Sequence, residues 1–237
     1  MKHFRNGWPW RDPECVRFAL PIIMMTCVLA LTSLVAGCAT WIIKEERITL
    51  YHTQLKVNTI PEAANIVVAV QVNDKRDYLA PGISRKWGKA VVGYGRNGLG
   101  EETYPDIIVT RPVEQTIRQA VESELKARGF HVADDANLQI VIDINTFFND
   151  YKVGFLRSDA VADLDMHVKM LSNGENRFSR QIAAQGRTAW AATMGSRDAE
   201  AALNMALDNG IDALFDDDAF IAALLMHKTA AGLPGKT

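Results

Sequence analysis

The longest apolar stretch of the chain is FALPIIMMTCVLALTSLVAG, which spans residues 18–37 and contains no charged residue. The residues ahead of it carry four basic and two acidic side chains. A basic start followed by an apolar run and small residues is typical of a secretory signal. A run of about 20 apolar residues is also long enough to cross a bilayer, so an uncleaved inner-membrane anchor is the alternative. Because the run is apolar on every side, it suits lipid better than the core of a globular domain.

Cys38 follows this run directly, in the sequence VAGC at residues 35–38. These four residues resemble the bacterial lipobox, in which the cysteine receives a diacylglycerol through a thioether and the signal is then cut just ahead of it. We therefore predict lipidation at Cys38 and signal cleavage between Gly37 and Cys38. Cys15 and Cys27 would leave with the signal, so the mature chain would keep one cysteine and form no internal disulfide.

The residue after the cysteine and the charge of the chain bear on its location and partners. The residue after the cysteine is Ala39. An aspartate at this position would resemble an inner-membrane retention signal, so the alanine favours the periplasmic face of the outer membrane. Several acyl chains would hold the protein to the membrane far more firmly than one. The net charge is −2 and no lysine- or arginine-rich block occurs, so we expect no nucleic-acid partner.

The apolar run and the composition of the remainder predict four segments. We expect a lipoprotein signal peptide over residues 1–37, a lipidated N-terminus and tether over 38–60, one periplasmic domain over 61–228 and a disordered tail over 229–237. Within the tether, residues 48–57 suggest an edge strand.

The clearest predicted helix spans residues 111–130. Pro112 lies in its first turn, where a missing N–H group costs nothing, and Gly129 can end it in a left-handed conformation. Apolar residues recur every four positions and predict one buried stripe; they are Val113, Ile117, Val121 and Leu125.

Strands and two further helices complete the pattern. Residues 160–171 alternate strictly between apolar and polar side chains, which predicts a strand with one solvated face. The other expected strands lie at 65–77, 106–110, 137–150 and 178–193, with a turn at 172–176, a helix at 196–215 and a short helix after it. This order predicts an α+β fold, with one mixed, mostly antiparallel sheet and two main helices packed on one face.

Few residues of the sequence are candidates for catalysis or metal binding. Asp163, Asp165 and His167 share one face of the predicted strand and are weak candidates for a metal site. A solvated strand face has the same appearance, so we predict no metal, no cofactor and no enzymatic activity. Asp74 and Arg76 end the first strand and are interpreted as an exposed surface pair.

A glycine-rich region at residues 79–104 is the most irregular part of the sequence. It includes GYGRNG at 93–98, which matches a dinucleotide-binding pattern but is followed by no helical stripe, so a hairpin tip or loop is expected. Trp87, Tyr94 and Tyr104 are candidates for an interaction surface here, although aromatic residues can equally cover one end of a core.

Taken in order, several segments resemble the YajG-type family of bacterial lipoproteins. They are the lipobox with Cys38, VVAVQVNDKRD at 67–77, the helix from Pro112 to ELKARGF, NLQIVIDI at 137–144 and ADLDMHV at 162–168. The resemblance implies an outer-membrane lipoprotein facing the periplasm, in a family without an established role and without catalytic residues to carry over. The glycine-rich expansion between Arg76 and Pro112 departs from the family pattern.

We therefore expect a non-enzymatic binding or structural module of the cell envelope, whose partner is an envelope protein or the cell wall. The alternative is an accessory lipoprotein of a trans-envelope lipid transport system. An envelope hydrolase or metal-dependent enzyme is the third hypothesis.

Overall fold

The computed structural model describes residues 46–54, 57–77, 88–96, 102–153, 158–189 and 195–231. The chain divides into two units, Met1–Ile43 and Lys44–Thr237, and all described residues belong to the second. The elements are β1 (Glu46–Ile48), η2 (Pro61–Asn65), β2 (Val67–Asp74), η3 (Gly88–Ala90), β3 (Val91–Arg96), β4 (Glu102–Val109), α2 (Val113–Ala127), β5 (His131–Val132), β6 (Leu138–Val153), β7 (Ser158–Ser172), β8 (Glu175–Thr188), α3 (Ser196–Phe215) and α4 (Asp218–Ala231).

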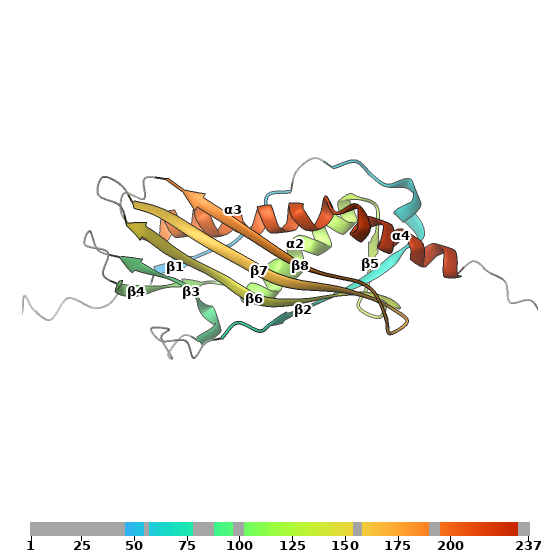
Figure 1. Cartoon of the computed structure of the whole chain (residues 1–237), viewed down its shortest axis with the longest axis horizontal. Helices are drawn as coiled ribbons and strands as arrows, with labels where there is room; N and C mark the ends of the chain where they lie inside the picture. Colours follow the sequence, from blue (N-terminus) through green and yellow to red (C-terminus); the bar gives the residue numbers. More distant parts are fainter. Residues whose placement is uncertain are drawn as a thin grey trace, which may run out of the picture. The chain divides into compact units, whose positions relative to one another are not determined.

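One mixed sheet of eight strands organises this domain (Figure 1). The long strand β6 lies at its centre and pairs antiparallel with β7 along one edge, and β7 pairs antiparallel with β8. The other edge of β6 is shared, because β2 runs parallel to its first half and β3 meets it near Asn149. Strands β4 and β1 follow β3, and the two-residue β5 follows β2. The predicted α+β fold with a mixed sheet is confirmed.

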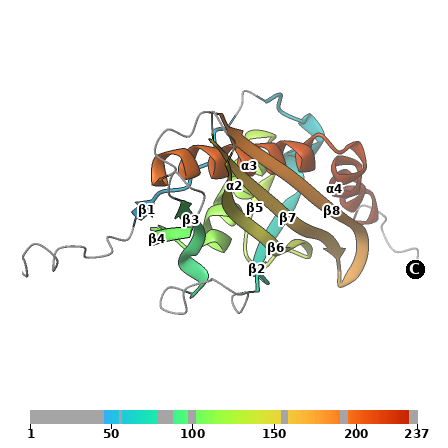
Figure 2. The ribbon, with the colours of Figure 1, turned by 60° about the vertical axis from the view of Figure 1, so that its left-hand side comes forward.

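The two main helices pack on one face of the sheet (Figure 2). Helix α2 packs mainly against β2, whereas α3 lies along β8 and β7. The apolar side chains of both helices and of the inner sheet face form one core, which includes Ile117, Leu125, Leu203 and Leu207. Among the described residues, no helix has both the length and the apolar character needed to cross a membrane.

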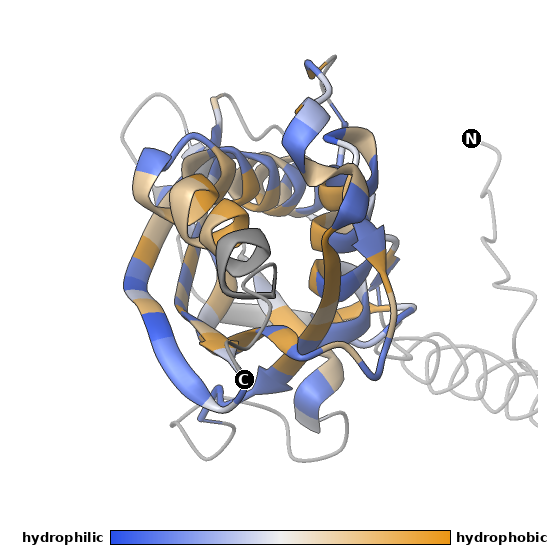
Figure 3. Ribbon diagram, turned by 90° about the vertical axis from the view of Figure 1, so that its right-hand side faces the viewer, coloured by the Kyte–Doolittle hydropathy of each residue, from blue (hydrophilic) through white to orange (hydrophobic). Residues whose placement is uncertain are grey.

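Alternation along the strands decides which residues enter the core, and it appears in Figure 3 as alternating blue and orange bands. In β7 the predicted inward positions are all buried, namely Ala160, Ala162, Leu164, Met166, Val168 and Met170. In β6 the even positions are buried up to Ile144, and the odd positions Phe147, Asn149 and Tyr151 are buried beyond it. A register shift between Ile144 and Thr146 explains this change, because one extra residue in a strand moves every later side chain to the other face.

Residues 46–54 lie in the segment assigned above to the tether. The structure pairs β1 in parallel with β4, and the Thr110 N–H donates to the Ile48 carbonyl over 2.9 Å. Ile48 and Leu50 are buried in the core. The ordered sheet therefore starts at least fifteen residues ahead of residue 61 (61 − 46 = 15). Burial of the two apolar side chains is favourable, whereas a solvated tether would leave them in water.

The glycine-rich region contains more regular structure than its composition suggests. Strand β3 begins two residues ahead of GYGRNG, at Val91, and continues through Arg96, and β3 pairs antiparallel with β4. This supports a hairpin at residues 91–109. The turn predicted at 172–176 is also present, with Asn173 and Gly174 at φ angles of 51° and 83°, as a tight two-residue hairpin requires.

Candidate functional site

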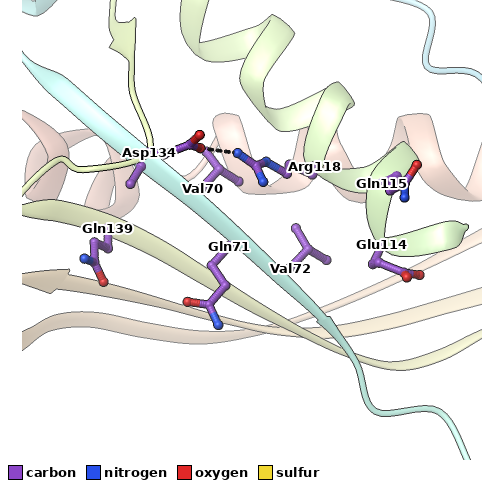
Figure 4. A pocket seen from close by; sticks show the side chains of 9 residues that line it. Val70, Gln71, Val72, Glu114, Gln115, Arg118, Asp134 and Gln139 are labelled. Carbon is purple, nitrogen blue, oxygen red and sulfur yellow. Dashed lines mark hydrogen bonds and ion pairs between the residues drawn. The ribbon is translucent and has the colours of Figure 1, made fainter.

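Two grooves border helix α2 on the described surface of the domain. The first has a volume of about 420 Å³ and lies between α2 and β2 (Figure 4). It is lined by β2 residues from Ala69 to Val72, by Glu114, Gln115 and Arg118 of α2, and by Asp134 and Gln139. The second, of about 310 Å³, lies between α2 and the segment around residues 49–54.

Arg118 and Asp134 bridge the first groove, as the dashed line in Figure 4 shows. The Arg118 Nε–H also donates to Glu122 over 2.7 Å. Hydrogen bonds to Glu122 and to Asp134 raise the pKa of the guanidinium above its usual value. Arg118 is therefore already neutralised by two carboxylates and offers little free positive charge to a ligand.

His52, which lines the second groove, lies between two carboxylates. Its Nε2 atom is 3.0 Å from Glu124 Oε1 and its Nδ1 atom is 2.7 Å from Asp208 Oδ1. Only 5% of the His52 side chain is exposed. Each ring nitrogen thus has a carboxylate oxygen within hydrogen-bond distance, and a ring nitrogen that carries a hydrogen can donate it to that oxygen.

His52, Glu124 and Asp208 form the His52 cluster, which extends further along helices α2 and α3. Arg128 pairs with Glu124, and the Arg128 guanidinium carbon lies 4.4 Å from the centre of the Phe215 ring. Burial raises the pKa of Asp212, although the positive charge of His52 acts in the opposite direction. The cluster ties the segment after β1 to α2 and α3.

The sequence offered no direct signal for this cluster. Glu124 and Asp208 are 72 and 156 residues away from His52 along the chain, so only the packing of α2 against α3 brings them together. Within the described ranges, no group of three or more His, Cys, Asp or Glu side chains is placed to hold a metal ion.

Asp74 and Arg76 form a buried pair, so the interpretation as an exposed surface pair is wrong. The side chains are 1% and 6% exposed, and Arg76 Nη2 lies 2.9 Å from Asp74 Oδ2. The remaining guanidinium N–H groups donate to Asp74 Oδ1 and to the carbonyls of Lys89, Val91 and Phe147. The pair therefore fastens the end of β2 to η3, β3 and β6.

The weak metal candidates on β7 point away from the core, toward the outer face of the sheet. Each one contacts a neighbour on β8 instead of converging with the others. Asp163 accepts a hydrogen bond from Gln185 over 2.8 Å, Asp165 accepts one from Gln181, and His167 Nε2 lies 2.8 Å from Ser179 Oγ. This arrangement is that of a polar, solvated sheet face.

The remaining predicted site residues are placed only in part. Tyr94 lies in β3, where its ring meets Phe148 edge-on with centroids 5.1 Å apart. Tyr104 lies in β4, with its side chain outside the described part of the structure. Trp87, Gly37 and Cys38 lie outside the described residues altogether.

Comparisons with known proteins found solved structures that are similar to this chain at low sequence identity. Solved structures similar to this chain include a protein from Xanthomonas campestris, with 14% identity over 78% of this chain and 96% of that chain and a TM-score of 0.48. Another is a minor lipoprotein from Acinetobacter baumannii, with 9% identity, coverages of 70% and 92% and a TM-score of 0.34. No curated protein matches the sequence.

A family model also matches the chain. It is described as "Uncharacterized lipoprotein" and aligns with residues 53–225, which is more than half of the chain. The match begins one residue after His52 and ends in α4, so it covers nearly all of the described domain. The chain belongs to this family, the YajG-type family of bacterial lipoproteins.

Proposed function

We propose that this lipoprotein is anchored through a lipid on Cys38 to the periplasmic face of the outer membrane, and that its domain is a non-enzymatic binding module. Membership of a lipoprotein family supports the anchor. The sequence VAGC directly after the apolar run supports Cys38 as the lipidated residue, and Ala39 supports the outer membrane.

The observation that carries this proposal is the short link between Cys38 and the folded domain. Strand β1 starts at Glu46, eight residues after Cys38 (46 − 38 = 8). A fully extended chain advances at most about 3.6 Å per residue, so the Cα atom of Glu46 would lie within about 29 Å of the Cα atom of Cys38. Buried Ile48 and Leu50 then attach this link to the core, which keeps the domain near the membrane surface.

The distribution of polar groups supports binding over catalysis. The most buried charged side chains are engaged with one another, as in the His52 cluster and the Asp74–Arg76 pair. The grooves on the two sides of α2 are instead lined by both polar and apolar residues. We infer that an envelope protein or a cell-wall component binds along α2.

Replacement of the cysteine tests the anchor. We expect Cys38→Ser to remain as an unprocessed precursor, because lipid addition precedes cleavage. Cys27→Ser, the matched control within the apolar run, should be processed and fractionate as the wild type does. Ala39→Asp should be lipidated but shift to the inner-membrane fraction. A Cys38→Ser protein found in the outer membrane at the processed mass would refute the anchor.

A further inference from the structure

Strand β2 has one edge that is paired over only two residues. On one side it follows β6 without interruption from Val68 to Asp74. On the other side it pairs with β5 only at Val67 and Val68, and the last bond is donated by the Ala133 N–H to the Val68 carbonyl over 3.1 Å. The chain then leaves this edge at Asp134.

The hydrogen-bond pattern shows which peptide groups point to the open edge. The carbonyls of Ile66 and Val68 accept from the β5 segment, whereas the Lys75 N–H donates to Ile144 of β6. Successive residues of a strand face opposite neighbours, so Val70 and Val72 direct both their N–H and C=O groups away from β6. Within the described part of the chain, no segment pairs with these groups.

The same edge borders the groove between α2 and β2. In Figure 4 the side chains of Val70 and Val72 point toward α2 and that of Gln71 points to the opposite side. The Arg118–Asp134 bridge closes the end where β5 leaves. Near the start of α2, the Glu114 Oε2 atom is buried and has no hydrogen-bond partner among the described residues.

We propose that the open edge of β2 binds an extended segment of a partner protein, which adds a strand beside β2 and places a lysine or arginine against Glu114. An extended backbone repeats its N–H and C=O groups every second residue, about 6.6 Å apart, and so matches Val70 and Val72. Addition of a strand to an exposed edge is an established mode of peptide recognition. The proposal rests on the proposed function and names the chemistry of the partner.

Charge argues for a basic segment of another protein over a second copy of this chain. Arg118 is already paired with Glu122 and Asp134, so it is not available to Glu114, whose Oε2 atom has no hydrogen-bond partner among the described residues. The β2 sequence, VVAVQVND, contains no basic residue. Two copies that paired through β2 would therefore not neutralise Glu114 from that strand.

Proline substitutions can distinguish the open edge of β2 from the edge that pairs with β6. Val72→Pro removes an N–H that points outward, and proline is tolerated at such an edge position. Gln71→Pro, the matched control, removes an N–H that bonds to β6. We expect Val72→Pro to keep a melting temperature near that of the wild type, and Gln71→Pro to lower it clearly.

The binding test uses the full lipidated protein in detergent and seven-residue peptides of alternating threonine and valine. Each peptide carries one lysine at a different position, and a matched set carries glutamate. We expect at least one lysine peptide to bind and to slow hydrogen exchange at Val70 and Val72. Val72→Pro should weaken this binding about tenfold, since a backbone bond is lost. Glu114→Gln should remove the preference for lysine over glutamate.

Several results would overturn the proposal. Amides of Val70 and Val72 that are protected before any peptide is added would mean that the chain covers its own edge. Protection that grows with protein concentration would indicate a second copy. Equal binding to wild type and Val72→Pro, or no binding by any lysine peptide, would exclude strand addition. All of these would leave the anchor at Cys38 standing, since that is tested separately by fractionation.

Discussion

At the scale of single residues, Arg76 illustrates what a short sequence motif cannot show. The guanidinium has five N–H groups, and the structure gives each one an acceptor, two on Asp74 and three on backbone carbonyls. From the sequence, Asp74 and Arg76 could be seen as a pair at the end of a strand. Their burial depends on β3 and β6, whose paths are set by the whole sheet.

Arg76→Lys should destabilise the domain strongly, because lysine keeps the charge but cannot reach acceptors on three sides. We expect a loss of about 3 kcal/mol in the free energy of unfolding, because buried acceptors around Arg76 would be left without a donor. Urea denaturation measures this loss. Arg177→Lys is the control, because Arg177 is 56% exposed and its pair should contribute at most about 1 kcal/mol. Equal midpoints for the two variants would contradict the structural role of Arg76.

Asp212 gives a prediction with a definite pH dependence. Burial raises its pKa, so the folded state disfavours the ionised form. The stability that this group contributes is therefore complete below its usual pKa of about 3.9 and is lost as the pH rises through the folded-state pKa. Asp212→Asn should melt at a higher temperature than the wild type at pH 7, and the difference should vanish near pH 3. A lower melting temperature at pH 7 would show that the attraction to His52 dominates.

At the scale of elements, local patterns predicted the helices and the regular strands well. Helix 196–215 was predicted with the bounds that α3 has, and the alternation in 160–171 identified the buried face of β7. The bulge in β6 was not predictable. The buried positions change from even to odd residue numbers there, but no glycine or proline marks the site. Likewise the strand β3 was not predicted over its full length within the glycine-rich region, since its glycines weaken every local strand signal.

The contact between β8 and α3 requires glycine at position 186. A Cβ atom there would overlap the backbone of Ala202 and Ala206, neither of which can move without shifting the helix. We expect Gly186→Ala to lower the free energy of unfolding by about 3 kcal/mol, the upper part of the usual range for overpacking.

Gly210→Ala is the matched control in α3. Its added methyl would meet the end of the flexible Leu164 side chain, and alanine favours a helix over glycine by about 1 kcal/mol. This variant should therefore cost clearly less than Gly186→Ala in the same denaturation experiment. A reversed order would mean that α3 does not press on β8 as the structure shows.

At the scale of the whole molecule, the fold and the family followed from the order of elements, whereas the grooves and the His52 cluster did not. The grooves depend on how α2 lies against β2 and against residues 49–54, which are contacts between distant parts of the chain. The start of the ordered domain was also placed too late, because β1 is only three residues long and gives no periodic signal. Because β1 starts at Glu46, the link to Cys38 is short, and the proposed anchor would hold the domain close to the membrane.

Mass spectrometry of the mature N-terminus tests the central claim, that a lipid on Cys38 holds this domain at a membrane. The protein would be purified from membranes, digested, and its first peptide identified. The account predicts a peptide that begins at Cys38 and carries fatty acyl groups on that residue. A first peptide that begins at any other residue, or a Cys38 peptide of unmodified mass, would contradict it.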